Sequence, residues 1–82
     1  MPTRANQNKT QLPVCSGEEA IRAFERNAWK IVRRHGSHVT LAKTGNSLVL
    51  TIPMHRELDR GLLRALIRKA DITVAEFSNL LR

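Results

Sequence analysis

The chain has 82 residues, enough for one small domain with a single hydrophobic core and too few for two. Its 14 lysines and arginines outnumber 7 aspartates and glutamates, and the formal charge of +7 favours a nucleic-acid backbone or an acidic protein as partner. The single cysteine, Cys15, excludes an internal disulfide, and no stretch resembles a signal peptide or a membrane span. We therefore expect a protein of the reducing cytoplasm in which Cys15 has no catalytic role.

The N-terminal fifteen residues differ in composition from the rest of the chain. Residues 1–15 are mainly polar, contain prolines and lack apolar periodicity, which predicts a flexible tail. The folded domain is expected to comprise residues 16–82. Ser16 and Glu19 have the spacing of a capping box, and the apolar residues that follow at helical spacing predict a first helix to about Asn27.

Three short segments rich in apolar and β-branched residues come next, separated by stretches of turn composition. They comprise residues 29–34, 38–43 and 48–52. We predict that they form an antiparallel three-stranded meander. Alternation along the second and third strands assigns five side chains to the face that packs on the helices: Val39, Leu41, Leu48, Leu50 and Ile52.

His38 opens the second of these strands and belongs to the opposite, outward face. Thr40, Ala42 and Thr51 are expected to share that face with it. In the first strand Lys30 and Arg33 have opposite parity, so strict alternation allows only one of them to join His38. An imidazole can give or take a proton near neutral pH, which makes an outward histidine in basic surroundings a candidate acid or base.

Two further helices are predicted after the strands. Asp59 is expected to cap a helix over residues 60–70, and Thr73 with Glu76 forms a second capping box before a short last helix. The predicted order is α-β-β-β-α-α, an α+β fold with a three-stranded antiparallel sheet packed on helices.

Three arginines recur at every fourth residue of the predicted second helix, and we name them the arginine stripe: Arg60, Arg64 and Arg68. This spacing brings them to one face of the helix, where they would present cations to a phosphate backbone or to an acidic partner. The same spacing also fits a face that is merely solvated.

From residue 16 to residue 81 the sequence resembles the HicA (YcfA-type) toxins of prokaryotic toxin–antitoxin modules. The matching stretches, in chain order, are Gly17-Glu18-Glu19-Ala20-Ile21-Arg22-Ala23, Trp29 to Arg33, Gly36-Ser37-His38, Ile52-Pro53-Met54-His55 with Glu57-Leu58, Gly61-Leu62-Leu63-Arg64, and Ile72-Thr73-Val74-Ala75-Glu76-Phe77. The Gly-Ser-His motif alone is weak, whereas the whole set in this order and at these spacings is specific.

The resemblance implies a double-stranded-RNA-binding-domain-like fold, endoribonuclease (mRNA interferase) activity, a catalytic histidine at His38 and neutralisation by a HicB-type antitoxin. Three residues depart from the family's usual pattern. Ala28 and Asp71 stand where the family commonly has glycine at helix C-termini, and Arg60 stands where it commonly has proline. Because left-handed backbone is usual at the two glycine positions, Ala28 and Asp71 are expected to cost stability.

Cleavage of RNA by its own 2′-hydroxyl needs a base, an acid for the leaving 5′-oxygen and cations near the phosphate, but no metal ion or other cofactor. We predict that His38 is the base or the acid, and that Gly36 and Ser37 determine how it approaches the RNA. The cations expected to contact RNA or stabilise the transition state are Lys30, Arg33, Arg34, Arg64 and Arg68.

Two other histidines remain to be placed. His55 is a candidate second proton-transfer group, although we favour a role at the helix entry or in packing. His35 and His38 have a His-x-x-His spacing but lack the further ligands of a zinc site, so no metal is expected.

Two other functions stay open. The same fold can hold RNA without cutting it, and the arginine stripe can serve only an acidic protein.

Overall fold

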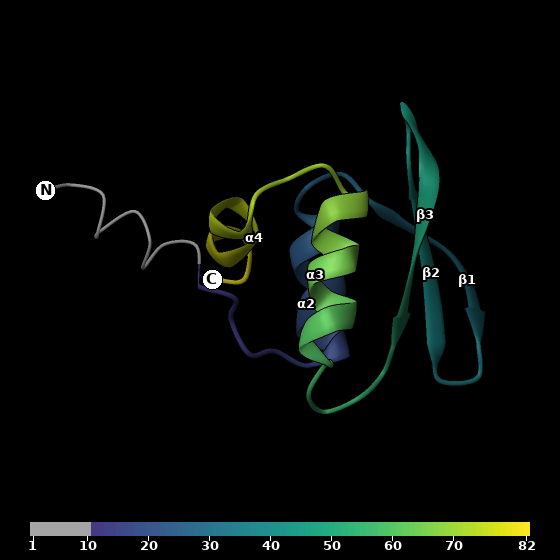
Figure 1. The fold of residues 1–82 in the computed structure, drawn as a ribbon. Helices are drawn as coiled ribbons and strands as arrows, with labels where there is room; N and C mark the ends of the chain where they lie inside the picture. The colour runs from purple at the N-terminus through teal and green to yellow at the C-terminus, as the bar shows by residue number, and fades with distance from the viewer. Residues whose placement is uncertain (1–10) are drawn as a thin grey trace, which may run out of the picture.

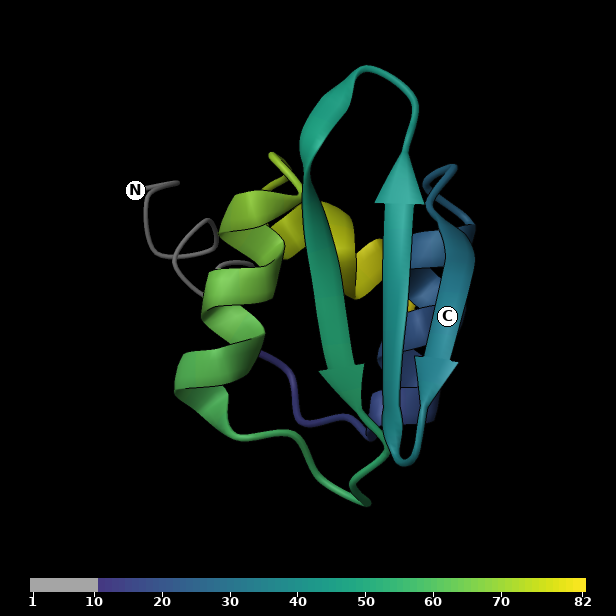
Figure 2. The ribbon, with the colours of Figure 1, turned by 90° about the vertical axis from the view of Figure 1, so that its right-hand side faces the viewer.

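The sheet, helices α2 and α3, and helix α4 lie in three successive layers in the computed structural model, which describes residues 11–82 (Figure 1). The elements are α2 (Gly17–Glu25), β1 (Lys30–His35), β2 (His38–Lys43), β3 (Asn46–Pro53), α3 (Arg60–Lys69) and α4 (Val74–Leu80). Their order is α-β-β-β-α-α and the sheet is antiparallel with β2 in the centre, so both predictions are confirmed. Within the described residues, helices cover only one face of the sheet (Figure 1, Figure 2).

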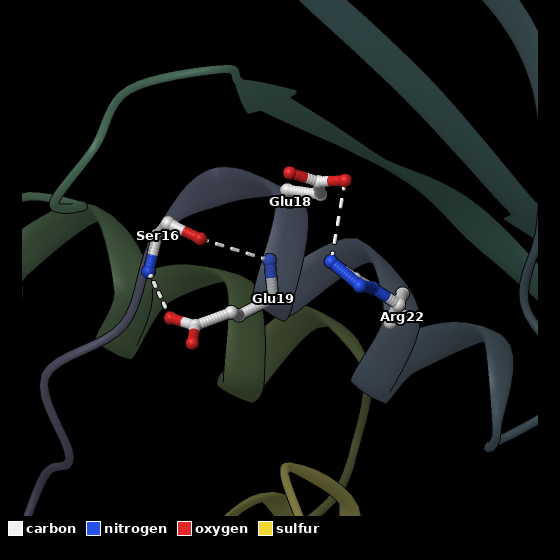
Figure 3. A network of polar contacts seen from close by, with 4 residues as sticks. All are labelled: Ser16, Glu18, Glu19 and Arg22. Atoms are coloured by element: carbon white, nitrogen blue, oxygen red, sulfur yellow. Dashed lines mark hydrogen bonds and ion pairs between the residues drawn. The ribbon is translucent and has the colours of Figure 1, made fainter.

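Each helix begins at the cap that the sequence predicts. The Ser16 hydroxyl accepts from the Glu19 amide at 3.0 Å, and the Glu19 carboxylate accepts from the Ser16 amide at 2.8 Å (Figure 3). Thr73 and Glu76 repeat this arrangement in α4, and Asp59 caps α3 by accepting from the Leu62 amide. Such caps satisfy amides that a helix start leaves unpaired, and each contributes about 1 kcal/mol to stability.

None of the helices in residues 11–82 has the length and apolar character that a membrane span requires.

Three aromatic side chains join the layers in the core. Phe24 of α2 lies edge-on to Trp29, with ring centroids 6.5 Å apart, and contacts Phe77 of α4 with centroids 5.1 Å apart. All three side chains are buried, together with the strand residues Val39, Leu41, Leu50 and Ile52, whose inward orientation the alternation predicts.

Leu48 is the exception among the residues assigned to the core. Its side chain is 50% exposed, so this assignment is wrong. Regular pairing from Leu41 and Leu50 would place Lys43 opposite Leu48, but Lys43 pairs with Asn46 instead. β3 has two more residues than β2 between these two pairs, so Leu48 has no regular partner, and residues 47–49 are all exposed at this end of the hairpin.

Two residues of the expected tail are buried in the core of the domain. Leu12 and Cys15 are buried, and the Cys15 carbonyl accepts from the Leu58 amide at 2.9 Å. In the described part of the chain, packing therefore begins at Leu12, although Val14 is exposed, while residues 1–10 of the predicted tail lie outside the described residues. Burial, with a smaller effect of the Glu19 carboxylate, raises the pKa of the Cys15 thiol to about 11, which keeps it protonated and unreactive at neutral pH.

The two departures at helix C-termini adopt left-handed backbone, as expected. Ala28 has a φ of 73° and Asp71 a φ of 62°. Such a conformation is costly for a residue with a Cβ atom, and less so for aspartate than for alanine. Replacing Ala28 with glycine should therefore raise the free energy of unfolding by about 1 kcal/mol, and Asp71→Gly by somewhat less.

Urea denaturation followed by circular dichroism measures both changes. The matched control is Ala65→Gly in the interior of α3, where the same exchange should lower stability by about 1 kcal/mol. Destabilisation by Ala28→Gly of the same size as in this control would contradict the backbone-strain account.

Candidate catalytic site on the open face of the sheet

The turn between β1 and β2 places two histidines face to face. Gly36 and Ser37 are the only residues between His35 and His38, which pair with each other in the sheet. Gly36 has a φ of +60° and Ser37 has no positive φ, the pattern of a type II′ turn, whose twist matches that of the flanking strands. The His38 side chain is exposed at the start of β2, in agreement with the expected outward orientation.

The strand register identifies the side chains that accompany His38, because directly paired residues of an antiparallel sheet point to the same face. Two adjacent rows cross the open face from β1 to β3: His35, His38 and Pro53 form one, and Arg33, Thr40 and Thr51 form the other. No helix covers this face in the part of the chain that the structure describes (Figure 2). The surface around His38 is therefore open to a macromolecule.

A β-bulge in β1 brings two cations to this face instead of one. Lys30 pairs with Ala42 and Arg33 with Thr40, so Val32 is an extra residue that has no partner in β2. The extra residue resets the alternation, and Lys30 and Arg33 both belong to the face of His38. The expectation that only one of Lys30 and Arg33 could share the face of His38 was wrong, because strict alternation takes no account of a bulge.

Arg34, the third cation predicted for this region, lies differently. It pairs with Val39, whose side chain is buried in the core, so its position belongs to the helix-covered face of the sheet. The Arg34 side chain is exposed at the edge strand. The register therefore groups Lys30 and Arg33 with His38 and separates Arg34 from them.

His55 lies at the same end of the domain, in the segment that follows β3. The Met54 amide donates to the Ser37 carbonyl at 2.7 Å, and the His55 carbonyl accepts from the Gly17 amide at 2.9 Å. The exposed His55 side chain lines a shallow groove, which is formed by Ser16, Glu18, Met54, His55 and Arg56. This groove carries both signs of charge, since Glu18 and Arg56 line it and Glu18 is ion-paired with Arg22 at 3.2 Å.

Gly17 holds this end of the domain together, a role that the sequence analysis missed. A Cβ atom at Gly17 would lie 2.0 Å from the carbonyl oxygen of Pro53, so only glycine allows α2 to start against the end of β3. A glycine in the first turn of an amphipathic helix was the available signal, because glycine weakens a helix and needs a packing reason there.

The arginine stripe borders the opposite edge of the sheet. All three of its side chains are exposed, and α3 lies beside β3 when the open face is viewed directly (Figure 2). Arg68 and Lys69 line a shallow groove together with Asp71 and residues 45–48 of the hairpin. The Asn46 side-chain amide donates to the Lys69 carbonyl at 3.2 Å. Cations therefore lie on the open face near β1 and on α3 beyond β3.

A hollow of the molecule lies at the far end of β2 from His38. It has a volume of about 190 Å³ and is lined by Asn27, residues 43–46 and residues 70–72. Within residues 11–82, the His, Cys, Asp and Glu side chains form no cluster of three or more that could hold a metal ion. An open surface suits an extended substrate better than a small molecule, which usually needs a concave pocket.

The fold and this surface define a small basic α+β protein with an accessible histidine at the rim of an uncovered sheet. Residues 17–72, from the start of α2 to just beyond α3, match the model of a family described as HicA toxin of bacterial toxin-antitoxin. The chain belongs to the HicA toxin family, and it is thus a toxin of a toxin–antitoxin system, which implies an antitoxin partner. A comparison with curated proteins gave no match.

Proposed function

We propose that the protein is an endoribonuclease that cuts mRNA without a metal ion, with His38 as a proton-transfer group. The main observation in support of this proposal is the exposed His38 imidazole on an uncovered sheet face that also holds Lys30 and Arg33. Membership of the HicA toxin family supports this assignment. We further propose that a HicB-type antitoxin neutralises the protein in the cytoplasm.

The proposed reaction uses the nucleophile that RNA carries. The 2′-oxygen attacks phosphorus, the bond from phosphorus to the 5′-oxygen breaks, and a 2′,3′-cyclic phosphate and a 5′-hydroxyl result. His38 takes the proton of the 2′-hydroxyl or supplies one to the 5′-oxygen. Lys30 and Arg33 stabilise the charge that develops on the phosphoryl oxygens. At Gly36 no atom beyond its two chain neighbours lies within 4 Å of the position that a Cβ would occupy, so the turn leaves room for the RNA backbone beside His38.

The direct test is cleavage of a defined RNA by the purified protein in the presence of EDTA, with analysis of the product ends. We expect cleavage with cyclic or 2′/3′-phosphate ends, because the 2′-hydroxyl is the nucleophile and the protein's own groups move the protons. An absolute requirement for added divalent ions would disprove the mechanism. Binding of RNA without cleavage would favour the alternative of a non-catalytic RNA-binding module.

The arginine stripe is proposed to contact the phosphate backbone of RNA. Replacing Arg64 and Arg68 together with glutamine should weaken RNA binding at low salt. It should also reduce the slope of log Kd against log salt, by about one counterion per lost phosphate contact. The measurement uses the cleavage-deficient His38→Ala background, so that the RNA stays intact during the titration.

The matched control is the double variant Arg22→Gln and Arg82→Gln. It also lowers the net charge of +7 by two, but the two arginines that it removes are exposed on α2 and at the C-terminus. A general effect of net charge should be small and equal in both variants. Equal losses would show that the stripe has no specific role in binding RNA.

A further inference from the structure

His35 and His38 form a cross-strand pair on the proposed catalytic face. They are the residues that flank the two-residue turn, they pair directly, and both side chains are exposed. Directly opposed residues of an antiparallel sheet share a face and have Cβ atoms about 5 Å apart. Two imidazole side chains therefore extend from neighbouring positions at the rim of the open sheet.

The chemistry of RNA cleavage needs two proton-transfer groups in different places. In an in-line displacement the attacking 2′-oxygen and the leaving 5′-oxygen are on opposite sides of phosphorus. A single imidazole would have to serve both oxygens, whereas two imidazoles on neighbouring strands can flank one phosphate.

We propose that His35 is the second proton-transfer group and divides the two transfers with His38, an inference that rests on the proposed function. One neutral imidazole takes the proton of the 2′-hydroxyl as the bond from the 2′-oxygen to phosphorus forms. The other, as imidazolium, gives its proton to the 5′-oxygen as the bond from phosphorus to that oxygen breaks. The pair ends with its protonation exchanged, and solvent restores it.

The surroundings favour His35 over His55 for this task. Arg33 is the charged residue nearest to His35 along the open face of β1, and the pairing partner across the sheet is His38 itself. β1 is an edge strand, so within residues 11–82 no further strand pairs with it on the other side. His55, in contrast, follows the end of β3 at Pro53, so no strand pairing places its side chain on the face of His38.

The pH dependence of kcat/KM on a short RNA in EDTA tests the assignment. The wild type should give a bell-shaped profile, because one group must be neutral and the other protonated. In His35→Gln, kcat/KM should fall by a factor of about 10² or more and one limb of the bell should disappear. His35→Ala serves as a second variant, and circular dichroism and thermal melting check that both stay folded, as expected for an exposed residue.

A substrate with a 5′-bridging sulfur identifies the acid. Sulfur leaves as a thiolate and needs no proton, so the variant that lacks the acid should recover activity on this substrate and the variant that lacks the base should not. We expect that one of the two variants, His35→Gln or His38→Gln, is rescued and the other is not. Rescue of one and not the other assigns both roles to the pair.

The rival arrangement, with His55 as the second group, predicts the reverse pattern. In that case His55→Gln would lose a limb of the profile, and His35→Gln would keep both limbs and an activity within a few-fold of the wild type. That result would overturn the inference while leaving the proposed function intact. A wild type that does not cut RNA at all would instead remove the proposed function and the inference with it.

Discussion

Replacing His38 with alanine should reduce RNA cleavage by a factor of about 10² to 10⁴ and abolish toxicity on expression, while the fold persists. The side chain is exposed on the open face of the sheet and contributes little to the core, so the imidazole is lost without a cavity. Initial rates on a defined RNA measure the effect on cleavage, and growth after induction measures the effect on toxicity.

The control for this variant is Thr51→Ala, which removes a polar group from the same face but no titrating group. It should cut RNA at a rate within a few-fold of the wild type. Circular dichroism and thermal melting of both variants should match the parent. Activity of His38→Ala close to that of the control would show that the catalyst lies elsewhere.

A second large effect is expected on stability, from the change of Gly17 to alanine. The added Cβ would lie 2.0 Å from the Pro53 carbonyl oxygen, and backbone atoms on both sides of the clash cannot rotate away. We expect the free energy of unfolding to fall by about 3 kcal/mol, at the upper end of overpacking effects. For a domain of this size the melting temperature should drop by about 15 °C.

Gly61→Ala is the matched control, because Gly61 also lies in the first turn of a helix. A Cβ atom there meets only the Asp59 carboxylate, at 3.2 Å, and this side chain can shift by a few tenths of an ångström. Its unfolding free energy should change by less than about 1 kcal/mol. Similar melting temperatures for the two variants would refute the close contact between α2 and β3.

The helices and strands could be predicted from short sequence patterns, because interactions between residues close in the chain determine where these elements begin and which face is buried. The capping boxes at Ser16 and Thr73 fix where helices begin, and the alternation of Val39 and Leu41 fixes which face of β2 is buried. His38 could be placed on the open face by the same alternation, since no irregularity interrupts its pairing with Pro53.

The errors share a different cause, which is pairing between distant parts of the chain. Val32 and Leu48 sit at register shifts, and a shift depends on how two strands align rather than on either strand's own pattern. Leu12 and Cys15 are buried, and the Cys15 carbonyl accepts from the distant Leu58 amide, so the polar local composition did not reveal their burial. The same non-local pairing groups Lys30 with Arg33 and brings His35 opposite His38.

The bulge at Val32 also bears on how the protein behaves at high concentration. β1 is an edge strand, and a straight edge exposes amides and carbonyls that another chain can pair with. The bulge interrupts that regular row, and three of the six residues of β1 are lysine or arginine, which repel a second copy of the same edge. The distortion that brings two cations beside His38 thus also makes β1 a poor template for self-association, which protects an open sheet from aggregation.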